Sequence, residues 1–170
     1  DIENAKLKDR NDHLMFENIE LRSNRPASET DAADLAAQNW PGCEAAFAWS
    51  FYSQGSREQM AASSDLFLKT ALDFFGDDED KQFAAGPAGP FEKGQRLARV
   101  VSRRRTLLIL DGVEPLQFAP ISPTPGQLKD QGLAALLTGL ATNSQGLCVV
   151  TTRYSLPDLQ AFRQTTAPEV

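Results

Sequence analysis

The sequence predicts a three-layer α/β domain with a mainly parallel sheet, and two patterns support this prediction. Uninterrupted apolar stretches at 106–111 and 147–152 end in polar residues, as parallel strands covered by helices on both faces do. The segments around them carry apolar residues at helical spacing. A chain of 170 residues, 41% hydrophobic and 24% charged, has the composition of about one globular domain.

The first 25 residues differ from the rest in their high charge and lack of glycine. Leucines and asparagines each recur there every seven residues, at Leu7, Leu14 and Leu21 and at Asn4, Asn11 and Asn18. Three asparagines would remove most of an apolar seam, so two interpretations stay open. Residues 1–25 form either a solvated charged helix or a weak coiled coil, which would bind a protein partner or self-associate through residues 1–22. Residues 26–38 are small and polar, and they are interpreted as a linker to an α/β domain at 39–170.

The α/β domain is expected to begin with a strand at 45–52, which is rich in aromatic residues and followed by Ser-Gln-Gly. We expect Trp49, Phe51 and Tyr52 in the core rather than stacked on a ligand. A helix over 58–75 follows and ends at a glycine. Its apolar residues recur three and four apart, at Phe67, Leu68, Ala71, Leu72 and Phe75.

An acidic loop, rich in alanine, glycine and proline in its second half, is predicted at 77–90. Its four adjacent acidic residues do not converge on a cation without a loop like that of the EF-hand, so no metal site is expected there. A helix over 91–104 turns its apolar residues inward. The arginines at 103–105 are interpreted as its last turn, where cations complement the helix dipole.

The strand at 106–111 is expected in the middle of the sheet, between the strands at 45–52 and 147–152. A stiff, non-helical loop with four prolines follows it. Asp130 is expected to cap the next helix, and the last strand is expected to be buried. A short helix near 155–163 closes this part. The buried face of the helix after Asp130 is formed by Leu133, Leu136, Leu137 and Leu140.

The composition argues against several functional classes. The single histidine, His13, lies among charged residues and is interpreted as a surface residue, so multi-histidine metal sites and His-dependent triads are not expected. Cys43 and Cys148 are isolated, which suits a reducing compartment. The net charge of −6 argues against binding nucleic acid through its phosphates, and no apolar run is long enough for a membrane span. A cytoplasmic protein is expected.

Polar residues follow two strands that are expected to be neighbours. Asp111 ends the middle strand, Glu114 follows it, and Thr151, Thr152 and Arg153 follow the last apolar run. Ligands of open parallel sheets bind at the carboxyl ends of the strands, so these residues are expected to share one cleft. A carboxylate there can hold Mg²⁺ through water, a second acid can orient an attacking water, and an arginine can reach a terminal phosphate. The structural alternatives are turn chemistry at Asp-Gly and an arginine that meets only solvent.

Taken together, the stretches at 48–77, 93–117 and 128–162 resemble the ATPase core of bacterial signal-transduction (STAND) P-loop NTPases of the NACHT and NB-ARC kind. The resemblance implies a partial P-loop NTPase fold. In that fold LLILDGVEP is similar to the Walker B element, with Asp111 at the magnesium-associated position and Glu114 as the acid that follows.

The segment VVTTR resembles the sensor-1 element of this family. The resemblance implies that Arg153 faces the terminal phosphate and that Thr151 and Thr152 lie beside the nucleotide. It also implies Mg-ATP as the cofactor, a role in signalling or defence, and Glu114 and Arg153 as the residues nearest to catalysis. Pro115 stands where many relatives keep another acid.

A larger departure from the family concerns the phosphate-binding loop. No G-x-x-x-x-G-K-[ST] motif occurs, and none of the six lysines follows a glycine. The backbone amides and the lysine of that motif supply most of the grip on the phosphates. The sequence is therefore interpreted as a fragment of a switch ATPase, such as a truncated gene product, with weak or absent binding of Mg-ATP. Whether it is an active enzyme stays open.

Two alternatives to an ATPase fragment are kept. One is a non-enzymatic interaction module, in which the N-terminal helix mediates assembly and the α/β part is a degenerate scaffold. The other is a hydrolase on a doubly wound sheet, which the chain fits poorly because it has no nucleophile elbow and no usable histidine.

Overall fold

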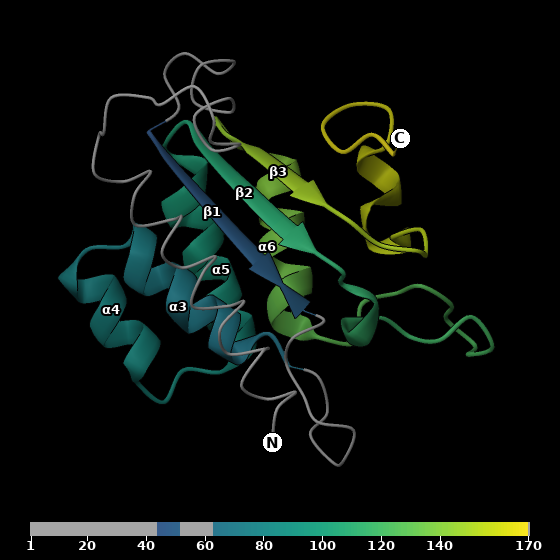
Figure 1. Cartoon of the computed structure of the whole chain (residues 1–170), viewed down its shortest axis with the longest axis horizontal. Coiled ribbons are helices and arrows are strands. Elements are labelled where there is room, and N and C mark those ends of the chain that lie inside the picture. The colour runs from purple at the N-terminus through teal and green to yellow at the C-terminus, as the bar shows by residue number, and fades with distance from the viewer. Residues whose placement is uncertain (1–43, 52–62, 170) are drawn as a thin grey trace, which may run out of the picture.

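The computed structural model describes residues 44–51 and 63–169, and the predicted N-terminal helix at 1–25, the linker at 26–38 and Tyr52 lie outside them. A parallel three-stranded sheet forms the centre of this part (Figure 1). Its strands are β1 (Ala45–Ser50), β2 (Thr106–Asp111) and β3 (Leu147–Val150), in the order β1-β2-β3. The three predicted strands, their parallel direction and the middle position of the Asp111 strand are therefore confirmed, but β1 ends at Ser50 instead of residue 52 and β3 ends at Val150 instead of residue 152.

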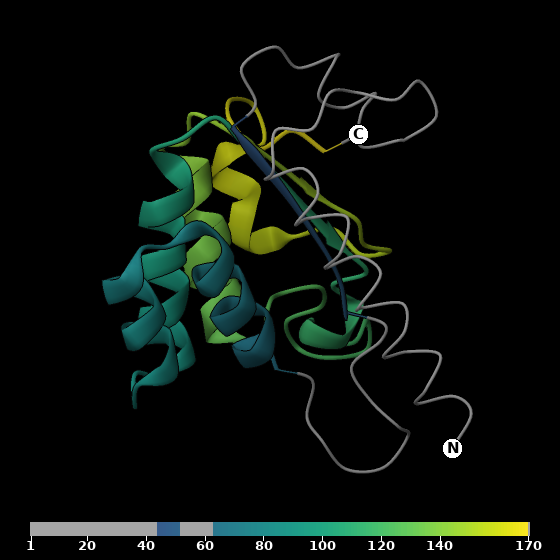
Figure 2. The ribbon, with the colours of Figure 1, turned by 60° about the vertical axis from the view of Figure 1, so that its left-hand side comes forward.

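The α-helices of the described residues are α3 (Asp65–Phe75), α4 (Asp78–Ala85), α5 (Pro90–Ser102) and α6 (Gln131–Thr142). Two 3₁₀ helices complete the described elements, η2 (Glu114–Leu116) and η3 (Pro157–Phe162). The two views in Figures 1 and 2 place the α-helices on the same face of the sheet. Residues 44–51 and 63–169 thus form a sheet layer and one helical layer. The prediction of a second helical layer is not met by these residues. None of the described helices is long and apolar enough to cross a bilayer.

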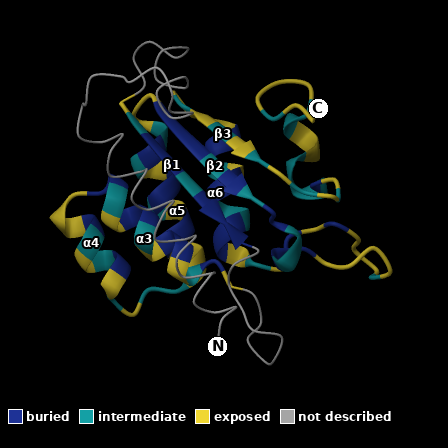
Figure 3. Cartoon of the chain, in the orientation of Figure 1, coloured by how far each residue is buried: buried dark blue, intermediate teal, exposed yellow. Residues whose placement is uncertain are grey.

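The expectation that the last strand is buried is wrong. Leu147 is 43% exposed and Val149 is 39% exposed, whereas Leu107, the register partner of Leu147 on β2, is only 5% exposed. Figure 3 shows the same contrast between a largely buried β2 and the exposed positions of β3. The apolar composition of β3 does not reveal that the strand lies at the edge of the described sheet.

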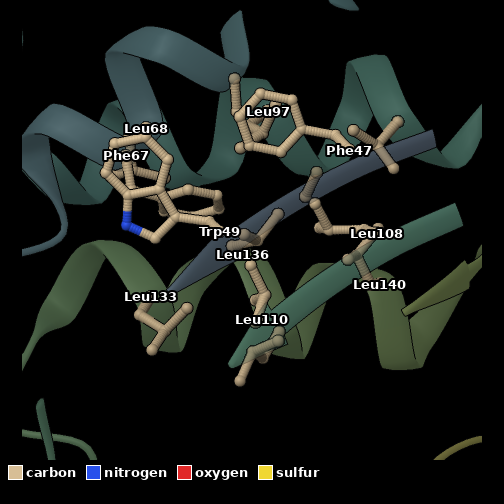
Figure 4. Packing of buried hydrophobic residues seen from close by; sticks show 14 of the residues in the cluster. Phe47, Trp49, Phe67, Leu68, Leu97, Leu108, Leu110, Leu133, Leu136 and Leu140 are labelled. Atoms are coloured by element: carbon tan, nitrogen blue, oxygen red, sulfur yellow. The ribbon is translucent and has the colours of Figure 1, made fainter. Parts of the chain in front are cut away.

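The core lies between the helices and one face of the sheet, where side chains of alternate strand residues point (Figure 4). Phe47 and Trp49 of β1 are buried there beside Phe67 of α3, with ring centroids about 6 Å apart. The prediction that Trp49 and Phe51 belong to the core is confirmed. Leucines from β2, α5 and α6 fill the rest of the core, among them Leu97, Leu108, Leu110, Leu133, Leu136 and Leu140.

The predicted acidic loop at 77–90 is wrong for its first half, which forms α4. Asp77 caps this helix, because its side chain accepts a hydrogen bond from the Asp80 amide and the Asp80 side chain accepts one from the Asp77 amide. The amide hydrogen bond holds the pKa of Asp77 below its ordinary value. Asp80 is also buried and receives the guanidinium of Arg96, which ties α4 to α5. The carboxylates therefore serve helix capping and an ion pair.

The ends of the other helices differ from the prediction by up to seven residues. α3 begins at Asp65, although the pattern predicts a start near residue 58. α5 ends at Ser102, so Arg103 is the C-cap and Arg104 and Arg105 follow the helix instead of forming its last turn. The prediction that Asp130 caps α6 is confirmed, because its carboxylate accepts a hydrogen bond from the Leu133 amide at 2.8 Å.

Candidate functional site

The five residues predicted to form a site lie on three short segments at the carboxyl end of the sheet. Asp111 is the last residue of β2 and Glu114, three residues further along, is the first residue of η2. Thr151, Thr152 and Arg153 follow β3 directly. The parallel pairing of β2 with β3 brings these segments side by side. Their placement at one edge of the sheet follows from the strand topology.

The carboxylate of Asp111 is held by two hydroxyl groups from neighbouring strand ends. The Thr151 Oγ1 hydroxyl donates to Oδ1 at 2.8 Å, and the Ser50 Oγ hydroxyl donates to Oδ2 at 3.0 Å. Thr151 Oγ1 in turn accepts a hydrogen bond from the Gly112 amide at 2.9 Å. Gly112 has a φ of 69°, a left-handed conformation that glycine adopts without strain. The chain can therefore turn directly after Asp111 while the amide of Gly112 faces Thr151.

Ser50 is a member of this cluster that sequence reasoning missed. It is buried at the end of β1 and pairs with Asp111 in the strand register. A serine at the end of a strand is common, and only the register shows that it lies opposite the carboxylate. The signal that could have found it is the predicted strand order, which places the ends of 45–52 and 106–111 side by side.

Glu114 and Arg153 meet mainly through the backbone. The Arg153 amide donates to Glu114 Oε1 at 2.7 Å, while Arg153 Nε lies 3.9 Å from the same oxygen. The Glu114 side chain is 13% exposed, and that of Arg153 is 78% exposed. The carboxylate is therefore fixed next to the strand end, and the guanidinium extends into solvent.

Thr152 faces a different set of partners from Thr151. Its hydroxyl donates to Gln117 Oε1 at 2.5 Å and accepts from the Tyr154 amide at 3.2 Å. Gln117 is buried, and its Nε2 donates to the carbonyl oxygens of Gly126 and Ser155. Gln117 thus joins the segments that follow β2 and β3. The sequence offered no signal for it, because its role depends on a loop that folds back.

A hollow of about 350 Å³ lies beside these residues. Glu114 lines it, but Asp111 and Arg153 do not, so the structure does not bring all three predicted residues into this one hollow. A larger groove of about 1060 Å³ lies away from the site, between α5 and α6. The small hollow is lined by Glu114, Pro115, Gln117, Phe118, Ala119, Lys129 and Tyr154.

The carboxylate of Asp111 and the hydroxyl groups of Thr151 and Ser50 offer only oxygen atoms as metal ligands. Oxygen ligands suit a hard cation such as Mg²⁺. Asp111 would hold the cation, with Thr151 and Ser50 orienting the carboxylate. Residues 44–51 and 63–169 contain no group of three or more His, Cys, Asp or Glu side chains that could hold a metal ion. A cation bound by one carboxylate keeps most of its water ligands.

Among the described residues the one cysteine is Cys148 on β3, and it has no disulfide partner there. Burial raises the pKa of its thiol to about 12. The thiol is therefore protonated at neutral pH, and a thiol in that state is a poor nucleophile. Cys148 contributes packing next to the candidate site rather than a reactive group.

Comparison with protein-family models, curated proteins and solved structures finds no match for this chain.

Proposed function

We propose that residues 39–170 are part of an ATPase core of the STAND signalling class, in which Asp111 is the magnesium-associated carboxylate. The observation that carries the proposal is the hydrogen bond of 2.8 Å from Thr151 to Asp111, which joins the ends of two neighbouring parallel strands. Ligands of open parallel sheets bind at this end of the strands. The resemblance of LLILDGVEP and VVTTR to Walker B and sensor-1 elements adds to this argument.

Each residue has a distinct role in this proposal. Asp111 would hold Mg²⁺, which when bound neutralises charge on the phosphates of ATP. Glu114, held by the Arg153 amide, would orient a water molecule. The exposed guanidinium of Arg153 would reach a terminal phosphate, and the hydroxyl of Thr151 would keep Asp111 in position. Thr152, which bonds Gln117, would fix the loop that carries Arg153.

The proposed affinity for Mg-ATP is low. The 170 residues contain no G-x-x-x-x-G-K-[ST] motif, so neither a backbone nest nor its lysine grips the phosphates. One carboxylate and one arginine replace only part of such a site. We therefore expect a dissociation constant no tighter than about 1 mM, which corresponds to about −4 kcal/mol, and no measurable turnover by these residues alone.

An NMR titration of the ¹⁵N-labelled chain with Mg-ATP tests the proposal, with MgCl₂ alone as a reference. The amide signals of Gly112, Thr151 and Arg153 are expected to shift at millimolar Mg-ATP. The Asp111→Asn variant keeps an acceptor for the hydroxyl groups but lacks the charge, so the shifts should weaken. The Asp73→Asn variant, changed at an exposed carboxylate of α3, should behave like the parent chain.

Two outcomes of the titration would contradict the proposal. Shifts that are absent, or that are the same in Asp111→Asn and Asp73→Asn, would remove Asp111 from any nucleotide site. Micromolar binding that disappears in Asp111→Asn would support the site but overturn the low affinity, and it would show that another segment replaces the phosphate-binding loop.

A non-enzymatic interaction module is the second candidate, and one observation favours it. Both oxygens of the Asp111 carboxylate already accept hydroxyl hydrogen bonds, as a carboxylate that only braces strand ends would. In this alternative the N-terminal residues 1–22, which lie outside the described chain, would bind a protein partner or self-associate in the cytoplasm. A peptide of residues 1–25 that forms a stable helical dimer by circular dichroism and sedimentation would support it.

A further inference from the structure

One face of the sheet carries none of the described α-helices. Side chains alternate along each strand, so the strand register gathers every second residue on this face. Phe47 and Leu108 belong to the other set and point into the core, on the side where the described α-helices lie (Figures 2 and 4). Before Ser50 and Asp111 at the strand ends, the opposite face is entirely apolar. Its residues, named the open face from here on, are Ala46, Ala48, Leu107, Ile109, Leu147 and Val149.

The open face is buried over β1 and β2 and exposed over β3. Leu107 is only 5% exposed and Ala46 only 9%, whereas Leu147 and Val149 are 43% and 39% exposed. A sheet face that meets water is normally polar, and an apolar, buried face is typical of a parallel sheet that is covered on both sides. The burial of Leu107 therefore indicates that a further segment covers the β1 and β2 half of the open face.

The residues that precede β1 have the position, the length and the pattern to supply this cover. The Glu44 amide donates to the Arg105 carbonyl at 2.7 Å, so residues 1–43 join the sheet at the amino end of β1. A helix over residues 1–25 would be about 37 Å long, and a six-residue strand spans about 20 Å. Residues 26–43 can span up to about 60 Å, which lets such a helix fold back along the sheet. Residues 52–62, in contrast, are needed to join β1 to α3 in the helical layer.

We propose that the leucine edge of residues 1–25, formed by Leu7, Leu14 and Leu21, packs on the open face over β1 and β2. Leucines seven residues apart stay on one side of a helix, so this edge can follow a strand along its length. Burial of the leucines against Leu107 and Ile109 removes both apolar surfaces from water. The chain connection makes this contact intramolecular, at an effective concentration in the millimolar range, and so favours it over contact with a second copy. A protein partner that binds the leucine edge must therefore first displace it from the sheet. This inference does not depend on the nucleotide site.

Methyl NMR of the full chain, labelled at leucine, isoleucine and valine, tests the proposal without any variant. Nuclear Overhauser effects (NOEs) are expected between the methyl groups of the leucine edge and those of Leu107 and Ile109. Leu14→Asp places a carboxylate on the leucine edge, so it should abolish these NOEs and shift the methyl signals of Leu107 and Ile109. His13→Asp is the matched control, because it introduces the same carboxylate one residue away, about 100° around a helix from Leu14. It should keep the NOEs of the parent chain.

A mixture of differently labelled copies distinguishes this contact from one between two molecules. Isotope-filtered spectra of the mixture should contain no NOEs between copies, and the NOEs within one copy should persist on dilution. Three results would overturn the proposal. They are a parent chain without NOEs between the leucine edge and the open face, NOEs that occur only between copies, and a loss of NOEs in His13→Asp equal to that in Leu14→Asp.

Discussion

The carboxylate of Asp130 joins the first turns of two helices, and its removal should destabilise the fold strongly. Oδ1 accepts hydrogen bonds from the Leu133 amide at 2.8 Å and from Ser64 Oγ at 2.5 Å. Oδ2 accepts a bond from the Ser64 amide at 2.9 Å. Ser64, the N-cap of α3, is 0% exposed, so no solvent reaches it in place of the carboxylate.

The expected loss follows from these contacts. Removing an N-cap costs about 1 kcal/mol. Leaving a buried donor without a partner costs about 1–3 kcal/mol. Asp130→Ala should therefore lower the free energy of unfolding by roughly 2–4 kcal/mol, the sum of these two costs. Asp130→Asn keeps one acceptor oxygen for Leu133 and Ser64 Oγ but faces the Ser64 amide with a donor, so its loss should be smaller.

Urea unfolding followed by far-UV circular dichroism and tryptophan fluorescence measures both variants. Asp73→Ala removes an exposed carboxylate from α3 and should stay within about 0.5 kcal/mol of the parent chain. In a double-mutant cycle, Ser64→Ala should cost less in the Asp130→Ala background than in the parent chain. Asp130→Ala within about 0.5 kcal/mol of the parent, or an additive cycle, would refute the idea that this carboxylate couples the two helices.

Two further predictions concern helix packing and the buried thiol. Gly94→Ala should destabilise the chain by about 1–3 kcal/mol despite a gain of about 1 kcal/mol in helix propensity, because the new Cβ would lie 2.1 Å from the Gly132 carbonyl oxygen. Urea unfolding measures it beside the exposed Gln95→Ala on the same helix, and a more stable Gly94→Ala would contradict it. With Cys43 changed to serine, the pKa of about 12 at Cys148 should slow alkylation at pH 8 about a thousandfold relative to an ordinary thiol. The rate should rise with pH as thiolate forms, whereas a plateau below pH 10 would show a pKa near the ordinary value.

The strands could be predicted from the sequence because their signal is local. The run at 106–111 is apolar without a break and ends in Asp-Gly, and the observed β2 has the predicted bounds. Gly112 explains the end of the strand, since its positive φ turns the chain there. The strand order is not a local property of the sequence, and the observed order agrees with the expected one.

The features that the prediction missed depend on contacts between distant residues. α4 is short, and its acidic sequence has the composition of a loop. It is helical because Asp77 and Asp80 form reciprocal capping hydrogen bonds and Arg96 of α5 pairs with Asp80. Val149 is exposed because β3 lies at the edge of the described sheet, and the apolar sequence of β3 does not show this. Pattern and composition carry no information on either point.

The residues of the candidate site divide into those that the fold uses and one that it does not. Asp111, Thr151 and Ser50 bond one another across three strand ends, so their substitution would disturb the structure whether or not a ligand binds there. Arg153 differs, because the bond to Glu114 uses its backbone amide and its side chain is 78% exposed. An ion pair at 3.9 Å whose arginine side chain is largely exposed contributes little to stability. In the Mg-ATP titration, the Arg153→Met variant therefore removes a contact to the ligand and leaves the fold intact. For this reason it distinguishes a nucleotide site from residues that only hold the strand ends together, and it does so more clearly than any change at Asp111.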